Sequence, residues 1–381
     1  MRLIMKILNF LAIVFLLLAQ DAFADEYKIT RITDNDYPDA AVEICGSKLA
    51  WQARPDNSKD TEIFYFDGLN TFKLTDNNNY ECTPSISSGG ITWQMHRIGR
   101  GSDIFFFDFE DNRIKRLTND KRDDYRPAVY GDKVVWCRSG PIEGCITVYD
   151  GRKSRIVKGA YGIFPRVSSE GVLYSDILKD RLYFYNWKDI IDLGDCDIEY
   201  TQAPHNQQIN EGKITWRKKI NDFHEVFIYD VASGVTSRIT EGESAQSHQI
   251  CPPAVCRGYA AWVNLKDGKK YLRLYDGKKT LTLASAIYID EPYFGDGLLV
   301  WAMGNVNEHI EIFIYNLSSH RMTRVTKDRF PDRYPIASGK HIAWQKEHSD
   351  YYKMRKNKVS LPPDELEKGL EIYLAEIHLS P

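Results

Sequence analysis

Two histidines and a glutamine are the residues of this chain that come nearest to a metal site. His205 lies in QAPHNQQIN and His248 in SAQSHQICPP, where Gln246 precedes it. Each histidine stands beside a proline that begins one of the repeat units described below, which predicts that both approach one mouth of the molecule. There is no third histidine at a comparable place and no C-x-x-C or H-x-x-x-H spacing. We therefore favour histidines that are satisfied by ordinary hydrogen bonds or by solvent.

Acidic residues are crowded in LTNDKRDDYRPAVYGDKVVW, which contains Asp120, Asp123 and Asp124. Variants of this segment recur along the chain, so we interpret most of these acids as part of a junction between repeat units. DNDYPD, residues 34 to 39, begins like a calcium loop but has Asp39 where such a loop needs glycine. A G-x-S-x-G nucleophile motif is absent from the sequence. The sequence thus favours binding over hydrolysis by a serine nucleophile.

Seven cysteines suit an oxidising compartment but leave one without a partner. Cys137 follows one predicted strand and Cys145 opens the next, so the two flank a hairpin and we predict a disulfide between them. Cys251 and Cys256 lie along one predicted strand, where a rise of about 3.3 Å per residue separates them too far for a bond. The pairing of the other five stays open: Cys45, Cys82, Cys196, Cys251 and Cys256.

A repeat of about 40 residues supplies the elements that would position these side chains. Each unit has an apolar run that mostly ends in Asp or Asn, and upstream of it a proline followed by a bulky aromatic residue. Such β-branched and aromatic runs between turn-forming residues predict β-strands. The eight runs are EIFYFD (62 to 67), DIFFFD (103 to 108), CITVYD (145 to 150), RLYFYN (181 to 186), EVFIYD (225 to 230), YLRLYD (271 to 276), EIFIYN (311 to 316) and EIYLAE (371 to 376).

Eight units of four strands predict an all-β fold, an eight-bladed β-propeller of four-stranded antiparallel blades. In each unit we expect a first strand just after the proline, a second ending on the aromatic residue, and then a third and a fourth. No fourth strand follows the eighth third strand, but YKITRIT, residues 27 to 33, matches one. We therefore expect this N-terminal strand to complete the last blade. Tryptophans recur at one blade position, where they should pack between blades: Trp51, Trp93, Trp136, Trp216, Trp262, Trp301 and Trp344.

The segment EIFYFDGLNTFKLTDNNNYECTPSISSGGITWQ and its copies resemble the TolB-like, WD-related propeller repeat. The resemblance covers nearly all of residues 25 to 381 and implies the fold. Unlike TolB, which has six blades and an extra N-terminal α/β domain, this sequence predicts eight blades and no such domain. Similar propellers include periplasmic scaffolds, surface proteins and the propeller domains of peptidases and lyases. QSHQICP is also loosely similar to oligogalacturonate lyase, in which histidines and a glutamine hold a divalent metal.

Residues 1 to 24 have the features of a signal peptide, with Arg2 and Lys6 before an apolar run and Ala22 and Ala24 in an A-x-A arrangement. We expect a single propeller domain over residues 25 to 381, periplasmic or secreted, with no membrane span in the mature chain. The formal net charge of −3 argues against a nucleic-acid partner. We also expect a monomer. The least repetitive piece, residues 345 to 370, is an insertion in the last blade.

These features lead us to expect an exported, non-enzymatic propeller scaffold without a cofactor, whose loop face binds a protein or a cell-envelope polymer. The alternative is a metal-assisted polysaccharide lyase or hydrolase at the channel mouth. In that case His205, His248 and Gln246 would hold a divalent metal. The residues predicted to form the ligand-binding rim are Arg122, Asp124, Tyr125, Tyr161, Tyr200, His205, His248, Arg333 and Tyr334.

Overall fold

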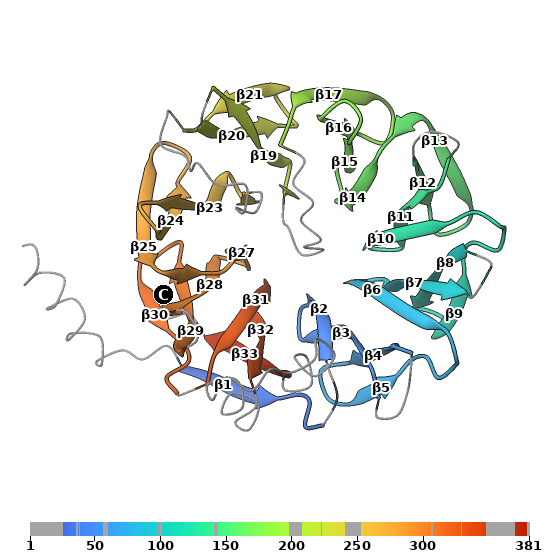
Figure 1. Ribbon diagram of the computed structural model, residues 1–381, viewed down its shortest axis with the longest axis horizontal. Coiled ribbons are helices and arrows are strands. Elements are labelled where there is room, and N and C mark those ends of the chain that lie inside the picture. The colour runs from blue at the N-terminus through green and yellow to red at the C-terminus, as the bar shows by residue number, and fades with distance from the viewer. Residues whose placement is uncertain are drawn as a thin grey trace, which may run out of the picture.

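Eight antiparallel sheets stand around a central axis in the computed structural model (Figure 1). The predicted eight-bladed propeller is confirmed, and each sheet forms one blade. No helix in the described part of the chain is long and apolar enough to cross a bilayer. The structure describes residues 26–35, 37, 39–55, 60–97, 99, 101–140, 144–197, 208–221, 223–240, 253–305, 308–328, 330–347 and 370–378.

Blades 1 to 4 each consist of four consecutive strands. Blade 1 contains β2 (Asp39–Cys45), β3 (Lys48–Ala53), β4 (Glu62–Phe66) and β5 (Thr71–Lys73). Blade 2 contains β6 (Tyr80–Ser87), β7 (Gly90–Arg97), β8 (Gly101–Asp108) and β9 (Arg113–Arg116). Blade 3 contains β10 (Asp124–Tyr130), β11 (Lys133–Arg138), β12 (Cys145–Tyr149) and β13 (Ser154–Tyr161). Blade 4 contains β14 (Ile163–Val167), β15 (Val172–Asp176), β16 (Arg181–Tyr185) and β17 (Ile190–Asp195).

Blades 5 and 6 follow the same order. Blade 7 has a split first strand, and blade 8 takes its fourth strand from the N-terminal part of the chain. Blade 5 contains β18 (Ile209–Asn210), β19 (Lys213–Ile220), β20 (Phe223–Asp230) and β21 (Val235–Arg238). Blade 6 contains β22 (Ala254–Cys256), β23 (Tyr259–Lys266), β24 (Lys269–Tyr275) and β25 (Thr280–Ala286). In blade 7 the first strand is split into β26 (Tyr288–Ile289) and β27 (Tyr293–Phe294), before β28 (Leu298–Asn305), β29 (Glu308–Asn316) and β30 (Met322–Arg324). Blade 8 contains β31 (Asp332–Ser338), β32 (His341–Glu347) and β33 (Leu370–His378).

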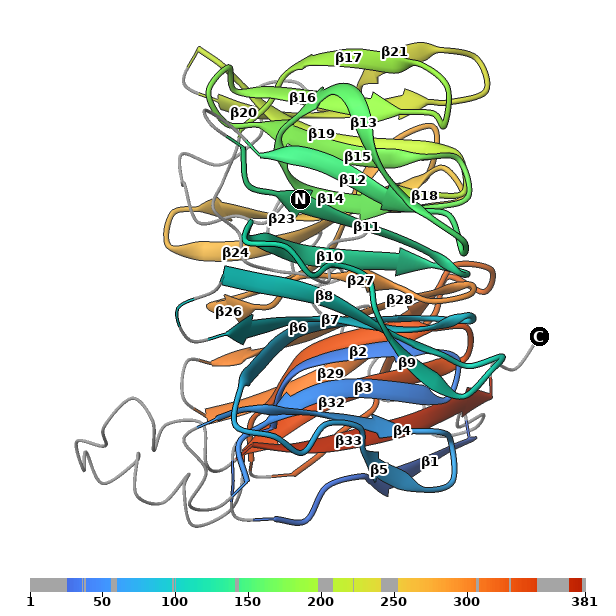
Figure 2. The ribbon, with the colours of Figure 1, turned by 90° about the vertical axis from the view of Figure 1, so that its right-hand side faces the viewer.

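Strand β1 (Glu26–Arg31) closes the ring as the fourth strand of blade 8. It pairs antiparallel with β33, from Glu26 opposite His378 to Arg31 opposite Tyr373. The two strands lie side by side in both views (Figures 1 and 2). The closing strand predicted from YKITRIT is therefore confirmed. The pairing covers the edge of β33 and gives the last blade four strands, like the others, with β1 as its outer edge.

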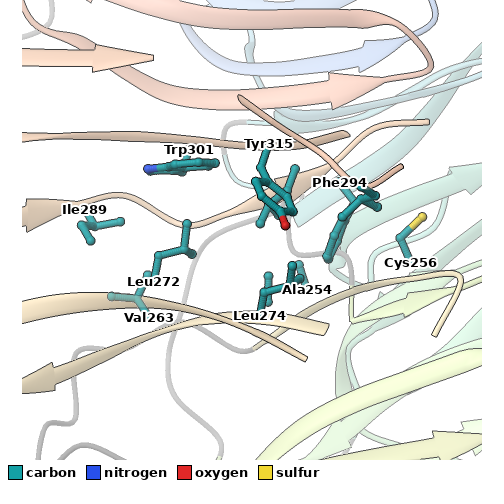
Figure 3. Packing of buried hydrophobic residues seen from close by; sticks show 12 residues of the cluster. Ala254, Cys256, Val263, Leu272, Leu274, Ile289, Phe294, Trp301 and Tyr315 are labelled. Carbon is teal, nitrogen blue, oxygen red and sulfur yellow. The ribbon is translucent and has the colours of Figure 1, made fainter. Parts of the chain in front are cut away.

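The repeated tryptophans fill the spaces between blades, as predicted. Trp301 of blade 7, for example, packs in one cluster with Val263, Leu272 and Leu274 of blade 6 (Figure 3). Its ring also stacks on Phe313 of the neighbouring strand, with centroids 5.9 Å apart and planes 16° apart. Each tryptophan thus holds its own blade together and fills the contact with the preceding blade. The same stacking recurs at Trp51, Trp93, Trp216 and Trp344.

A buried clasp ties the third strand to the fourth in blades 1, 2, 5, 7 and 8. In blade 2 the hydroxyl of Thr118 accepts the Ile104 N–H at 3.0 Å and donates to Asp103 at 3.2 Å. Arg116 pairs with the same carboxylate at 2.6 Å, and Asp103 is fully buried. We call this arrangement, a Lys or Arg two residues before a Thr and paired with an acid of the third strand, the Arg-x-Thr clasp. The other clasps contain Lys73, Thr75 and Glu62; Arg238, Thr240 and Glu225; Arg324, Thr326 and Glu311; and Arg31, Thr33 and Glu371.

The Arg-x-Thr clasp of blade 2 should contribute to the free energy of unfolding. Thr118→Val should lower the free energy of unfolding by roughly 1–3 kcal/mol, because the Ile104 N–H and the Asp103 carboxylate each lose a buried partner. Thr236→Val is the matched control, because Thr236 lies exposed on strand β21 and should change stability by less than about 0.5 kcal/mol. Urea unfolding followed by tryptophan fluorescence measures both values. Equal effects of the two substitutions would contradict the role of the clasp.

Candidate ligand-binding channel

The first strand of five consecutive blades carries a bulge where it faces the channel. In blades 8, 1, 2, 3 and 4 the register of the first strand shifts against the second. One residue at each bulge has a positive φ of 50 to 56°, although none is glycine. These five residues, which we call the bulge residues, are Tyr334, Ala41, Thr83, Arg126 and Phe164.

Four of the bulge residues directly precede a proline, and this corrects one expectation. We expected each first strand to begin after its proline, but β10 begins at Asp124 and contains Pro127. Proline has no N–H to give to a ladder, so it is tolerated only at a strand edge or a bulge. The innermost strand of a blade offers both. In blades 2, 3, 4 and 8 the proline therefore lies within the first strand, whereas β2 and β22 begin directly after Pro38 and Pro253, as expected.

The neighbouring blade satisfies the backbone of the bulge. The Thr83 N–H donates to Gln52 Oε1 at 3.0 Å, and the Arg126 N–H donates to Gln94 Oε1 at 3.1 Å. Each glutamine follows the repeated tryptophan of the preceding blade. A non-glycine residue with positive φ costs of order 1–3 kcal/mol and persists only where its surroundings fix it. The glutamine is one of the groups that fix it.

Cys137 replaces this glutamine between blades 3 and 4, and the predicted disulfide is wrong. Cys137 and Cys145 are both free thiols. The register pairs Cys145 with Arg138 and Cys137 with Ile146, so the two cysteines are one position out of step and point to opposite faces of the hairpin. The Cys137 sulfur instead accepts the N–H of the bulge residue Phe164, and burial raises the pKa of the Cys137 thiol.

Asp124 has a structural role, which corrects its prediction as a rim residue. It is fully buried, and its carboxylate accepts the Trp136 Nε1–H at 2.7 Å and two bonds from Arg138, from Nε at 2.8 Å and from Nη2 at 2.9 Å. Asp39 and Asp332 bind Trp51 and Trp344 in the same way, at 2.8 and 2.7 Å. The carboxylate at this position thus orients the tryptophan that separates two blades.

Burial shifts the titration of the equivalent carboxylates in blades 8, 1 and 2. The pKa of Asp39 is raised to about 7, chiefly because burial disfavours its charged form. Burial likewise raises the pKa of Asp332 and of Glu81, which stands at this position in blade 2, to about 7. Three neighbouring blades therefore share a group that titrates near neutral pH.

A cavity of about 840 Å³ occupies the channel beside these bulges. Its lining comes mainly from the first strands of blades 1 to 4, and Ile209 and Tyr293 add side chains from blades 5 and 7. Three bulge residues line it: Thr83, Arg126 and Phe164. The first strands lie nearest the axis in Figure 1. The strained backbone and the cavity therefore coincide.

Two arginines on neighbouring first strands give this cavity its cationic wall. The Arg126 guanidinium lies 4.0 Å from the centre of the Phe164 ring, and burial lowers its pKa. Burial also lowers the pKa of Arg166 to about 10, Glu291 opposes that shift, and Arg126 adds to it. Both side chains are half-buried. A guanidinium fork in such a place is suited to bind a carboxylate or a phosphate.

His96 also lines the cavity, but both ring nitrogens already have partners. Gln94 Nε2 lies 3.0 Å from His96 Nε2, and Ser102 Oγ lies 2.7 Å from His96 Nδ1. Among the described residues no group of three or more His, Cys, Asp or Glu is placed to hold a metal ion. The described walls of the channel therefore offer a binding surface with a cationic centre.

The predicted rim residues are dispersed. Tyr125 lines the cavity, whereas Arg122 is exposed near its mouth. Tyr161 lies on the outer strand β13, away from the cavity, and is 52% exposed. Arg333 pairs with Glu347 at 3.4 Å and lies over the Tyr288 ring. Tyr334 is the bulge residue of blade 8.

Several predictions fall outside the described residues: Tyr200, His205, Gln246, His248 and most of residues 345 to 370. The metal-site alternative therefore stays untested. Three residues of the cavity were not among the predicted rim residues: Arg126, Phe164 and Arg166. A usable signal was present, because Arg126 and Phe164 each stand directly before a repeated proline and Arg166 stands directly after one.

Comparisons with known proteins support the class of protein, a β-propeller. No family model matches the chain, and no curated protein sequence matches it. The β-propeller domain of the Trilobed protease from Pyrococcus furiosus is similar at 13% identity and a TM-score of 0.52, over 77% of this chain and 99% of that chain. The acylaminoacyl peptidase of Pyrococcus horikoshii is similar at 12% identity and a TM-score of 0.50, over 82% of this chain.

The chain spans only 58% of that peptidase. TolB from Acinetobacter baumannii is also among the similar structures, at 11% identity and a TM-score of 0.40, over 76% of this chain and 66% of that chain. At such low identity the likeness concerns the fold alone. The propeller fold that the resemblance to TolB-like repeats implied is confirmed.

The free thiols lead to a prediction. In native protein, iodoacetamide at about pH 8 should label Cys145 before Cys137, because Cys137 is fully buried and its pKa is raised. After unfolding, both should react alike. Peptide mapping by mass spectrometry measures the labelling. A peptide pair linked through Cys137 and Cys145 in a non-reduced digest would refute the free-thiol assignment.

The buried carboxylates predict how stability depends on pH. The pKa of Asp39 rises from 3.8 to about 7 on folding, so folding favours the protonated form, and the stability it contributes falls as the pH rises from about 4 to about 7. Asp39→Asn should remove this part of the fall in the free energy of unfolding between about pH 5 and about pH 8. Asp67→Asn is the control, because Asp67 is on an exposed turn and its pKa is lowered, so it titrates below this window. Urea unfolding across this pH range measures the free energy of unfolding. If it depends on pH in Asp39→Asn as it does in the wild type, the raised pKa of Asp39 is contradicted.

Proposed function

We propose that this protein is a non-enzymatic, exported binding module that takes part of a protein or a cell-envelope polymer into its central channel. One observation carries the proposal: the cavity of about 840 Å³ lies against the bulge residues of blades 2 to 4. Apolar and polar groups share its lining, as they do in ligand-binding clefts of this size. The amino-terminal residues 1 to 24, with their signal-peptide features, support export.

The distribution of residue types supports binding at the bulges. Positions that build the propeller repeat the same residue type, such as the tryptophans and the threonines of the Arg-x-Thr clasps. The bulge residues share one backbone conformation but differ in side chain: Ala41, Thr83, Arg126, Phe164 and Tyr334. A strained conformation that is held in place while its side chain varies is expected where side chains meet a ligand. The ring of bulges is therefore the proposed recognition surface.

Blocking the channel tests the proposal. Thr83→Tyr places a large side chain into the cavity, and the backbone tolerates it because Tyr334 and Phe164 occupy equivalent bulges. The immobilised wild-type protein should retain a component of the source cell's envelope extract, and Thr83→Tyr should lose it. Ala232→Tyr, on an exposed outer turn of blade 5, should retain it. Undiminished retention by Thr83→Tyr would place the binding site outside the channel.

A further inference from the structure

Arg126 and Arg166 converge on one residue of the channel wall. They come from β10 and β14, the first strands of neighbouring blades. The Arg126 guanidinium lies over the Phe164 ring at 4.0 Å, while Arg166 Nη1 donates to the Phe164 carbonyl oxygen at 3.3 Å. Phe164 thus fixes one guanidinium with its ring and the other with its backbone.

These two positive charges are close enough to affect each other and are only partly solvated. Burial and Arg126 lower the pKa of Arg166, and Glu291 offsets part of this shift. The described groups that act most on Arg126 are the Cys137 thiol and the Tyr125 hydroxyl, and neither is a carboxylate. Like charges held together in a partly desolvated place are costly. An anion that binds between them would offset this cost.

The rest of the lining limits how many negative charges a ligand can bring. Its other charged side chains are Glu43 and Asp123, and Asp123 accepts the Ser102 N–H at 2.9 Å. Both acids would repel a ligand that carries a carboxylate on every unit, such as an acidic polysaccharide. Apolar groups, among them Ile44, Phe164 and Tyr293, complete the walls. A ligand with one carboxylate on a partly apolar body fits this distribution.

The backbone of the wall indicates what kind of chain that ligand is. β6, β10 and β14 are each the terminal strand of their sheet, so one edge of every one of them has no partner strand and faces the channel. Unpaired strand edges bind extended peptides through main-chain hydrogen bonds. The bulges interrupt these edges near their middle, where the side chains of Thr83 and Arg126 are presented.

We propose that the channel binds the free C-terminal carboxylate of an extended peptide, with the Arg126 and Arg166 guanidinium groups as its donors. This inference rests on the proposed function and names the ligand of the same site. The planar fork of Arg126, already oriented by Phe164, donates two parallel N–H bonds to the carboxylate. Arg166 adds a second donor from the next blade. The strand edges and the apolar walls then hold the last residues of the peptide.

Affinity selection followed by mass spectrometry tests this inference on the full chain. The probes are a degenerate library of N-acetylated hexapeptides with free carboxylates, the same library as C-terminal amides, and oligogalacturonate as an acidic sugar. The wild-type protein should enrich free acids over amides by about tenfold or more. Arg126→Gln and Arg166→Gln should each abolish that preference, and Arg126→Lys should reduce it, because lysine keeps the charge but loses the fork.

Arg155→Gln is the matched control. Arg155 also lies near an aromatic ring, that of Tyr185, with 5.9 Å between its Cζ and the ring centre, but it is on the outer strand β13. This variant should keep the preference for free acids. Melting curves of all variants identify any that fail to fold. If Arg126→Gln or Arg166→Gln fails to fold, the other of the two tests carboxylate recognition.

The outcomes separate this inference from the proposed function. Equal retention of acids and amides, with both lost in Thr83→Tyr, would refute carboxylate recognition and leave channel binding intact. Retention of oligogalacturonate alone, likewise lost in Thr83→Tyr, would replace the peptide with an acidic sugar. Retention of every probe by Thr83→Tyr would refute both proposals.

Discussion

The Arg-x-Thr clasp is the interaction on which the regularity of this propeller depends. Its acids are at most 4% exposed, so each would be costly without the guanidinium or ammonium group and the hydroxyl that meet it. In blades 3, 4 and 6 the fourth strands lack this sequence pattern and have 8, 6 and 7 residues in β13, β17 and β25, against 3 or 4 in blades 1, 2, 5 and 7. In these blades the fourth strand is held by backbone pairing with the third, which contains one register shift in each blade. Either device fixes the outer edge of a blade.

A fixed outer edge permits an irregular inner one. The stacked tryptophans and the clasps lie in the outer three strands, whereas the bulges lie in the first strand, which no further strand constrains. The strain is localised at Thr83, Arg126 and Phe164, because a glutamine or Cys137 from the preceding blade takes the freed N–H, and at Tyr334, whose N–H donates to Asp290. The channel wall can therefore differ from blade to blade while the ring remains uniform. Arg126 and Phe164 occupy equivalent positions, and yet they contact each other.

How much of this could be predicted from the sequence depends on the range of the interaction. Blade number, the packing of residues such as Trp301 and the closing strand all follow from local patterns that repeat, because each repeat must bury the same face. Asp124 was misassigned because its acidic neighbours resemble a solvated turn, and only the fold brings it under the Trp136 indole. Cys137 was misassigned because the register that separates it from Cys145 by one position is set by the whole hairpin. Arg126 and Arg166 come together only when blades 3 and 4 pack side by side, so no local sequence pattern predicts their proximity.

The pairing of β1 with β33 determines when the ring can form. Thr33 and Glu371, joined in the clasp of blade 8, are 338 positions apart, so the cost in chain entropy of bringing them together is large. During synthesis β1 emerges first and must wait for β33, because the strand that it pairs with is made last. The other seven blades are each built from a continuous stretch of chain and need no such delay. The channel therefore acquires its complete wall only in the last step of assembly, when a row of independently formed blades becomes a circle.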